Sequence, residues 1–117
     1  MNAGAVTPEQ LAIINGRPPS VAHMFFDRVS QSGDREALRY PDDDEKWHSL
    51  TWGEVGDRVT RLAAGLISLG IQPGERAAIA AGTRYEWILA DLAINAAAAA
   101  TTTVYPSTGA EDTAYIL

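Results

Sequence analysis

The chain contains no cysteine and a single lysine, Lys46, and each shortage narrows the functions open to it. Without thiols, disulfide bridges, thiolate metal sites and cysteine nucleophiles are excluded. Lysine and arginine together number 9 against 15 acidic residues, which gives a net charge of -6. Proteins that bind nucleic acid need clustered basic side chains for the phosphates, so no nucleic-acid partner is expected. The remaining composition is typical of a globular domain.

Long apolar runs and a basic leader are also missing. Residues 1–16 lack the basic stretch that opens a secretory signal. The most membrane-like run, residues 92–104, is rich in alanine and is interrupted by Asn95 and three threonines. It is shorter than the roughly 20 apolar residues that a membrane span requires. No transmembrane segment is therefore predicted, and a cytoplasmic location is expected.

Glycine-rich phosphate loops are absent as well. Neither G-x-G-x-x-G nor G-x-x-x-x-G-K-[ST] occurs, and no G-x-S-x-G nucleophile motif is found. The stretch from 77 to 108 nevertheless has the pattern of a strand, a turn, a helix and a second strand. Its turn holds only Gly82, so an ordinary corner is the preferred interpretation. The alternative is an anion site in which Arg84, beside the start of the helix, binds an anion such as a CoA phosphate.

Residues that could hold a metal ion or carry out catalysis are isolated from one another. The acidic run Asp42 to Glu45 lacks the spacing of a calcium loop and is interpreted as a solvated hairpin loop. His23 and His48 lie on different predicted elements, so neither is expected to be a ligand or a base. Trp47, Trp52 and Trp87 could stack on a ligand, but Trp87 lies one turn into its helix and is expected in the core. The sequence therefore predicts no catalytic residue and no metal ligand.

Helix starts are marked by a repeated pattern, in which Thr is followed three residues later by Glu or Gln. This capping-box pattern occurs at Thr7/Gln10, Thr51/Glu54, Thr83/Glu86 and Thr108/Glu111. Apolar periodicity then predicts helices over 8–14, 20–31, 51–69, 83–98 and from 108 onward. Strands are predicted over 36–40, 47–50, 76–81 and 101–105.

The order of these elements predicts an α/β fold. The first two strands flank an acidic loop and form a hairpin, and the last two are joined by a helix, which makes them parallel neighbours. Strand 76–81 has no alternation, so burial on both faces is expected. A hairpin and two parallel strands make a small sheet for an α/β protein, and the chain stops within its last helix. The sequence therefore has the pattern of the beginning of something larger.

Several segments, taken in order, resemble the N-terminal part of long-chain fatty-acid–CoA ligases, which belong to the adenylate-forming, AMP-binding acyl-CoA synthetase superfamily. They include the residues LTWGEV (50–55), RLAAGLISLGIQPGER (61–76), TRYEW (83–87), VYPST (104–108) and YIL (115–117). The resemblance extends from about Pro18 to the end. It implies an N-terminal extension over 1–17 with a short helix, followed over 18–117 by an incomplete large AMP-binding domain.

This resemblance also implies a two-step reaction. In full-length members, ATP and a fatty acid form an acyl-adenylate with the help of Mg²⁺, and CoA then displaces AMP to give acyl-CoA. The family's phosphate loop, adenine site, metal site and catalytic lysine lie downstream of residue 117. The resemblance therefore implies a fragment that binds no cofactor alone and is inactive. For the full-length family it implies a cytoplasmic ligase. A peripheral association with the membrane, through the lipid substrate, is the alternative location.

Two departures from the family pattern lie near the last strand. The chain has Ala98 where the family usually has glycine, and Thr102 and Thr103 where it usually has Val-Pro.

The alternative function is a non-catalytic interaction module that complements another polypeptide, such as a downstream ligase fragment. A free-standing nucleotide-binding βαβ protein is the third hypothesis, against which the lone Gly82 argues.

Overall fold

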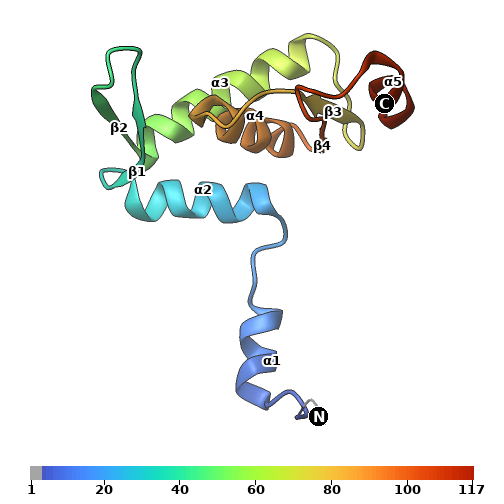
Figure 1. The fold of residues 1–117 in the computed structure, drawn as a ribbon. Coiled ribbons are helices and arrows are strands. Elements are labelled where there is room, and N and C mark those ends of the chain that lie inside the picture. The colour runs from blue at the N-terminus through green and yellow to red at the C-terminus, as the bar shows by residue number, and fades with distance from the viewer. Residues whose placement is uncertain (1–3) are drawn as a thin grey trace.

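The computed structural model describes residues 4–117, which contain five helices and four strands. In chain order they are α1 (Pro8–Asn15), α2 (Val21–Ser32), β1 (Glu36–Pro41), β2 (Trp47–Thr51), α3 (Trp52–Ser68), β3 (Arg76–Ile79), α4 (Tyr85–Ala96), β4 (Ala100–Thr103) and α5 (Ala110–Ile116). Helices α2, α3 and α4 lie together between the β1–β2 hairpin at one end and β3, β4 and α5 at the other, while α1 projects away (Figure 1). Among the helices of the described residues, none is long and apolar enough to cross a bilayer.

Two of the four predicted capping boxes are present, and they fix the starts of α1 and α3. The hydroxyls of Thr7 and Thr51 each accept a hydrogen bond from the backbone N–H three residues on, at 3.2 Å. In return, Gln10 and Glu54 accept from the backbone N–H of these threonines at 2.9 and 2.8 Å. Both boxes satisfy N–H groups that the helix itself leaves unpaired.

The other two predicted boxes are wrong. Helix α4 has Arg84 as its N-cap and α5 has Gly109, and neither residue makes a side-chain capping bond. Each helix begins one residue later than the pattern at Thr83 and Thr108 predicts. At α4 the physical reason is that Glu86 is held by the guanidinium of Arg84 and does not reach back to the threonine.

The strands form two separate two-stranded sheets. Strands β1 and β2 pair antiparallel, with Leu38 opposite Leu50 and Tyr40 opposite His48, which confirms the hairpin. Strands β3 and β4 pair parallel through the α4 crossover, as predicted. The two sheets are not joined to each other within the described residues, so the helices connect them.

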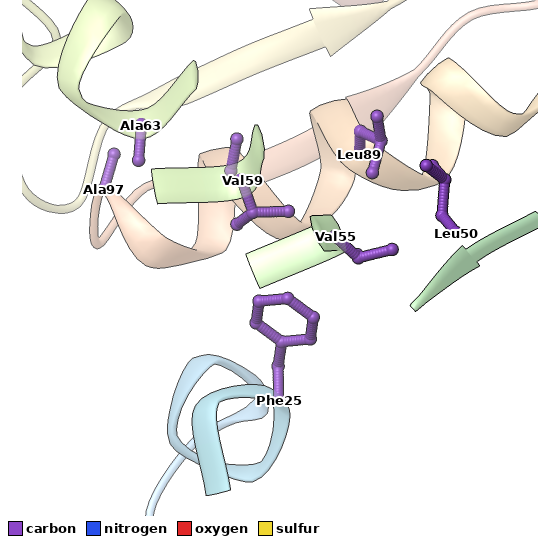
Figure 2. Packing of buried hydrophobic residues seen from close by; sticks show 8 residues of the cluster. Phe25, Leu50, Val55, Val59, Ala63, Leu89 and Ala97 are labelled. Carbon is purple, nitrogen blue, oxygen red and sulfur yellow. The ribbon is translucent and has the colours of Figure 1, made fainter. Parts of the chain in front are cut away.

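The core lies where α2, α3 and α4 meet the hairpin. Its buried members are Phe25, Leu50, Val55, Val59, Ala63, Leu89, Ala93 and Ala97. Figure 2 shows the Phe25 ring beneath α3, close to Val55 and Val59, with Leu89 and Leu50 on the far side. Helices α2 and α3 approach closely at Gly56, where an added Cβ would lie 2.8 Å from Cγ1 of Val29. Close packing of this kind leaves no room for a further methyl group.

Burial on both faces of β3, which the uniform apolar run predicts, is wrong. Ala78 and Ala80 are exposed, and only Ile79 is buried, because α4 covers one face of the β3–β4 pair.

The apolar stripe of α3 is also only partly covered. Val55 and Val59 are buried, but Leu69 is 86% exposed.

The turn that connects α4 to β4 carries Ala98, one of the departures noted in the sequence. Ala98 has a φ of 59°, a left-handed conformation that glycine adopts without strain. Its carbonyl accepts a hydrogen bond from the backbone N–H of Gly74 at 2.8 Å, which ties the turn to the loop before β3. In the adjoining strand, the hydroxyl of Thr101 is buried without a hydrogen-bond partner. A buried polar group in this state lowers the free energy of unfolding.

Candidate functional site

A cavity of about 700 Å³ opens at the carboxyl ends of β3 and β4. Its walls are the turn that follows β3, residues 103–106 at the end of β4, and the outer part of the hairpin. In open parallel sheets, ligands bind beyond the carboxyl ends of the strands. The cavity therefore occupies the position at which this architecture places binding sites.

One wall of the cavity is aromatic. Tyr40 of β1 and Tyr85 of α4 are stacked, with ring centroids 4.0 Å apart and an angle of 22° between the ring planes. On its own sheet Tyr40 also stacks on His48, at 5.6 Å and 27°. Arg58 of α3 donates a hydrogen bond to the hydroxyl of Tyr85 at 3.5 Å. These contacts fix the hairpin against α4 and so define the width of the cavity.

Two tryptophans complete the apolar lining. Trp47, at the start of β2, is 69% exposed and lies at the cavity wall. Trp87 packs against the small cluster of Ile79, Ile94 and Ala99 and also lines the cavity. The predicted core position of Trp87 is therefore only partly right, since the ring is half-buried. Such walls suit a flat or apolar group.

Arg84, the residue predicted as an anion ligand, lines this cavity and is already engaged. Its Nε and Nη2 atoms each donate to a different carboxylate oxygen of Glu86, both at 2.7 Å. This hydrogen-bonded ion pair raises the pKa of Arg84 and lowers the pKa of Glu86 below its ordinary value. Arg84 thus holds Glu86 at the start of α4, and its role as an anion ligand stays a prediction. Its side chain remains 62% exposed.

The interpretation of Gly82 as part of an ordinary corner stays a prediction. A Cβ placed on Gly82 would meet no protein atom within 4 Å, so the turn is open at this point, and it lines the cavity. The turn has a single glycine, whereas phosphate-cradling turns use several to let backbone N–H groups approach the anion.

The acidic hairpin loop is organised around Asp42. Its Oδ1 accepts hydrogen bonds from the backbone N–H groups of Asp44 and Lys46, both at 2.9 Å. Its Oδ2 lies 2.7 Å from Nε2 of His48, and this bond is the main cause of a lowered pKa at Asp42. Within residues 4–117 no three His, Asp or Glu side chains gather in a way that could hold a metal ion. The carboxylate of Asp42 therefore serves the turn itself.

Arg84, the anion ligand predicted from the sequence, lines the cavity, whereas the contact between Tyr40 and Tyr85 that shapes the cavity was not predicted. Tyr40 and Tyr85 are far apart in the chain, and no local pattern indicates that their rings meet. Trp47 and Trp87, which the sequence offers as residues that could stack on a ligand, both line the cavity.

A comparison with protein-family models finds one that matches most of the chain. The model described as AMP-binding enzyme matches residues 25–117. Among curated proteins, the long-chain-fatty-acid–CoA ligase FadD15 of Mycobacterium bovis is 40% identical over 74 residues. That match covers 63% of this chain and 12% of the relative. The chain therefore spans about an eighth of the length of the curated relative that it matches.

Solved structures show the same fold. The N-terminal subdomain of Klebsiella oxytoca NpsA superposes with a TM-score of 0.73 at 21% identity, covering 84% of this chain and 24% of that one. The acetoacetyl-CoA synthetase of Streptomyces lividans superposes with a TM-score of 0.70 at 29% identity, covering 79% and 14%. In both cases the chain corresponds to a small part of a larger molecule, which confirms the partial α/β fold predicted from the sequence.

Proposed function

The chain belongs to the AMP-binding enzyme family, and from that premise we propose that it forms the N-terminal part of a long-chain fatty-acid–CoA ligase. The observation that carries the proposal is the family match over residues 25–117 together with a long-chain ligase among the relatives. The boundary between an N-terminal extension, residues 1–17, and the AMP-binding region, residues 18–117, is part of the same proposal.

The reaction proposed for the whole enzyme has two steps. A fatty-acid carboxylate attacks the α-phosphate of ATP, which gives an acyl-adenylate and releases pyrophosphate. The thiol of CoA then attacks the acyl carbon and releases AMP. A cytoplasmic enzyme, with peripheral contact to membranes where its lipid substrate resides, fits this chemistry.

The residues of this segment do not fit the ATP phosphates or Mg²⁺ by themselves. The turn after β3 has a single glycine, Gly82, where phosphate loops use several, and the described carboxylates do not converge on a metal position. No chemical step is therefore assigned to this chain. Its proposed contribution is a scaffold and an aromatic wall against which the remainder of the enzyme completes its site.

Arg84 is proposed as an anion-binding residue within that completed site. Three observations support this role: its position at the cavity, its exposed guanidinium, and its place at the N-terminus of α4, where the helix dipole favours anions. The anion, such as a CoA phosphate, has to displace Glu86 or share the guanidinium with it. Binding there is consequently expected to strengthen when Glu86 is replaced by glutamine.

A chimera tests the proposed function directly. Residues 25–117 replace the matching region of the Mycobacterium bovis ligase, and fatty-acid-dependent release of pyrophosphate is measured. We expect the chimera to retain activity, because the segment supplies the same scaffold. A folded chimera that binds ATP but does not activate palmitate would contradict the assignment.

A second candidate, an interaction module that complements a downstream ligase fragment, is favoured by a separate groove. This groove, of about 590 Å³, lies along β3 between α3 and α4 and includes the exposed Leu62 and Leu69. Exposed apolar surfaces of this kind mark interfaces. Co-expression with the downstream segment is expected to yield a complex that survives purification, and Leu69→Asp is expected to weaken it. Failure of the two chains to co-purify would remove this candidate.

A further inference from the structure

An Asn-Gly pair, Asn15 and Gly16, stands at the C-terminal end of α1. Asn15 is the last residue of the helix, Gly16 is its C-cap, and both residues are exposed. Because glycine carries no Cβ, the backbone nitrogen of Gly16 meets little steric hindrance when it approaches the preceding side chain. The pair therefore combines an electrophilic carboxamide with a neighbouring nitrogen that is able to reach it.

The closed last turn of α1 protects this pair. The backbone N–H of Gly16 donates to the carbonyl of Ala12 at 2.9 Å, and the backbone N–H of Arg17 donates to the carbonyl of Ile14 at 3.3 Å. The Nη1 atom of Arg17 also donates to the Ile14 carbonyl, at 2.7 Å. While these bonds hold, the Gly16 nitrogen is directed back along the helix axis. Reaction within the pair therefore requires this turn to open.

Little else keeps the turn closed. No residue of α1 is buried, and the helix projects away from the body of the chain (Figure 1). A helix of eight residues that lacks packing is marginal in water, even with a capping box at its start. Unpacked segments of this kind open with a free energy close to zero. The open turn is therefore well populated, and in it the carboxamide of Asn15 and the N–H of Gly16 are free of the helix.

We propose that Asn15 is a site of spontaneous deamidation and that opening of α1 makes the site reactive. In the open turn the backbone nitrogen of Gly16 attacks the side-chain carbonyl carbon of Asn15, an intramolecular reaction favoured by proximity. A new C–N bond forms, the proton of that nitrogen passes to the departing amide, and ammonia leaves. Water then opens the resulting cyclic succinimide at either carbonyl, which leaves aspartate or isoaspartate at position 15. Water is the only co-reactant.

Deamidation changes the stability of α1, because it places a negative charge at the C-terminal end of the helix. The negative end of the helix dipole lies there, so an anion at this position is destabilising. An isoaspartate also adds a methylene to the backbone, which displaces the hydrogen bond between Gly16 and Ala12. The reaction therefore shifts α1 irreversibly towards its open state, and its extent records the time that the helix has spent open.

Peptide mapping of the aged 117-residue chain by mass spectrometry tests the proposal. The reference is a synthetic peptide with the sequence of residues 12–19, which is too short to form a helix. We expect the chain to convert Asn15 to a carboxylate at a rate within about tenfold of the peptide's rate, because opening of the turn costs little free energy. Full conversion of the peptide while Asn15 stays intact in the chain would overturn the proposal.

Two controls separate this route from general ageing of the chain. Asn95 lies in the packed helix α4, is followed by Ala96, and donates from Nδ2 to the carbonyl of Asp91 at 2.8 Å, so it should stay intact in the same sample. Gly16→Ala adds a Cβ beside the attacking nitrogen and should slow conversion at least about tenfold, in the chain and in the peptide alike. Unchanged conversion in Gly16→Ala, or equal conversion at Asn95, would contradict the succinimide route.

The effect on the helix is measured separately, with Asn15→Asp as a stand-in for the deamidated product. The backbone chemical shifts of α1 are expected to lose helical character relative to wild type near neutral pH, since the carboxylate opposes the helix dipole. The difference from wild type should shrink in acid, where that carboxylate is protonated. A difference that does not depend on pH, or no loss of helicity at all, would refute the proposed effect of the charge.

Discussion

The ring of Tyr40 lies stacked on the ring of Tyr85, with 4.0 Å between the centroids. Tyr40 belongs to the β1–β2 hairpin, and Tyr85 is the first residue of α4, the helix that links the parallel strands β3 and β4. Their contact is the point at which these two halves of the molecule meet beside the candidate cavity. It makes the shape of the cavity depend on the position of the hairpin.

Replacing either tyrosine by alanine is expected to destabilise the chain, and the two losses should not be additive. A stacked aromatic pair contributes about 0.5–1.5 kcal/mol beyond the area that it buries. A double-mutant cycle of Tyr40→Ala and Tyr85→Ala, followed by urea unfolding, measures this coupling. Tyr40→Phe is the control, since it keeps the ring. Additive losses would show that the rings do not stabilise each other.

A methyl group at Gly56 is expected to lower stability, although alanine is the better helix former. The added Cβ would lie 2.8 Å from Cγ1 of Val29, and overpacking of this kind costs about 1–3 kcal/mol. Gly65→Ala in the same helix is the matched control, since nothing lies within 4 Å of its added Cβ. It should gain up to about 1 kcal/mol from helix propensity. Equal effects at both positions, measured by thermal unfolding, would contradict the close approach of α2 and α3.

Ala98→Gly is expected to stabilise the chain. Relief of the left-handed strain at φ 59° is worth about 1–2 kcal/mol, and the greater freedom of glycine in the unfolded chain offsets about half of it. Ala100→Gly in β4 is the control and should destabilise, because that residue has an extended backbone. Chemical unfolding of both variants decides the point. A loss of stability in Ala98→Gly would refute the left-handed conformation.

The Arg84–Glu86 pair predicts a change of stability with pH. The hydrogen bonds from Arg84 hold the pKa of Glu86 below its ordinary value of 4.5, so the pair stabilises the fold above that pH. The contribution is lost as pH falls through the folded-state pKa. Glu86→Gln should therefore be less stable than wild type near neutral pH and equal to it in strong acid. Both side chains are exposed, so the difference is small.

Urea unfolding of wild type and Glu86→Gln at several pH values measures this difference. Glu111→Gln in the first turn of α5 is a suitable control, because its carboxylate has no ion-pair partner within the described residues. A gap between wild type and Glu86→Gln that stays constant down to strong acid would mean that the carboxylate is not held by Arg84 in solution.

The sequence predicts the local elements well, because their signals are local. Examples are the threonine caps at Thr7 and Thr51 and the end of α3 before Gly70, which has a φ of 104°. Each of these signals depends on residues within one turn of each other. The box at Thr83 fails because a four-residue pattern contains no information on a competing partner, such as the guanidinium that holds Glu86. At Thr108 the described residues offer Glu111 no such ion-pair partner, and α5 instead begins after Gly109.

The cavity could not be predicted, because it depends on contacts between distant segments. The position of the cavity at the ends of the parallel strands follows from the strand–helix–strand pattern. The wall that the hairpin contributes does not follow from any pattern in the sequence. Likewise, the apolar stripe of α3 shows which face of the helix can be buried. It does not show how far the elements packed on that face extend, so the exposure of Leu69 at its end could not be predicted. Ala98 is the exception, since comparison with the family's usual glycine drew attention to a residue that the structure places in the left-handed region.

The central claim is that this segment supports adenylation only together with the remainder of an AMP-binding enzyme. Fatty-acid-dependent exchange of pyrophosphate into ATP by the purified 117-residue chain tests it most directly. With palmitate, ATP and Mg²⁺ present, the chain alone is predicted to show no exchange above background, and addition of a downstream ligase segment is predicted to produce it. Clear, palmitate-dependent exchange by the chain alone would contradict the claim.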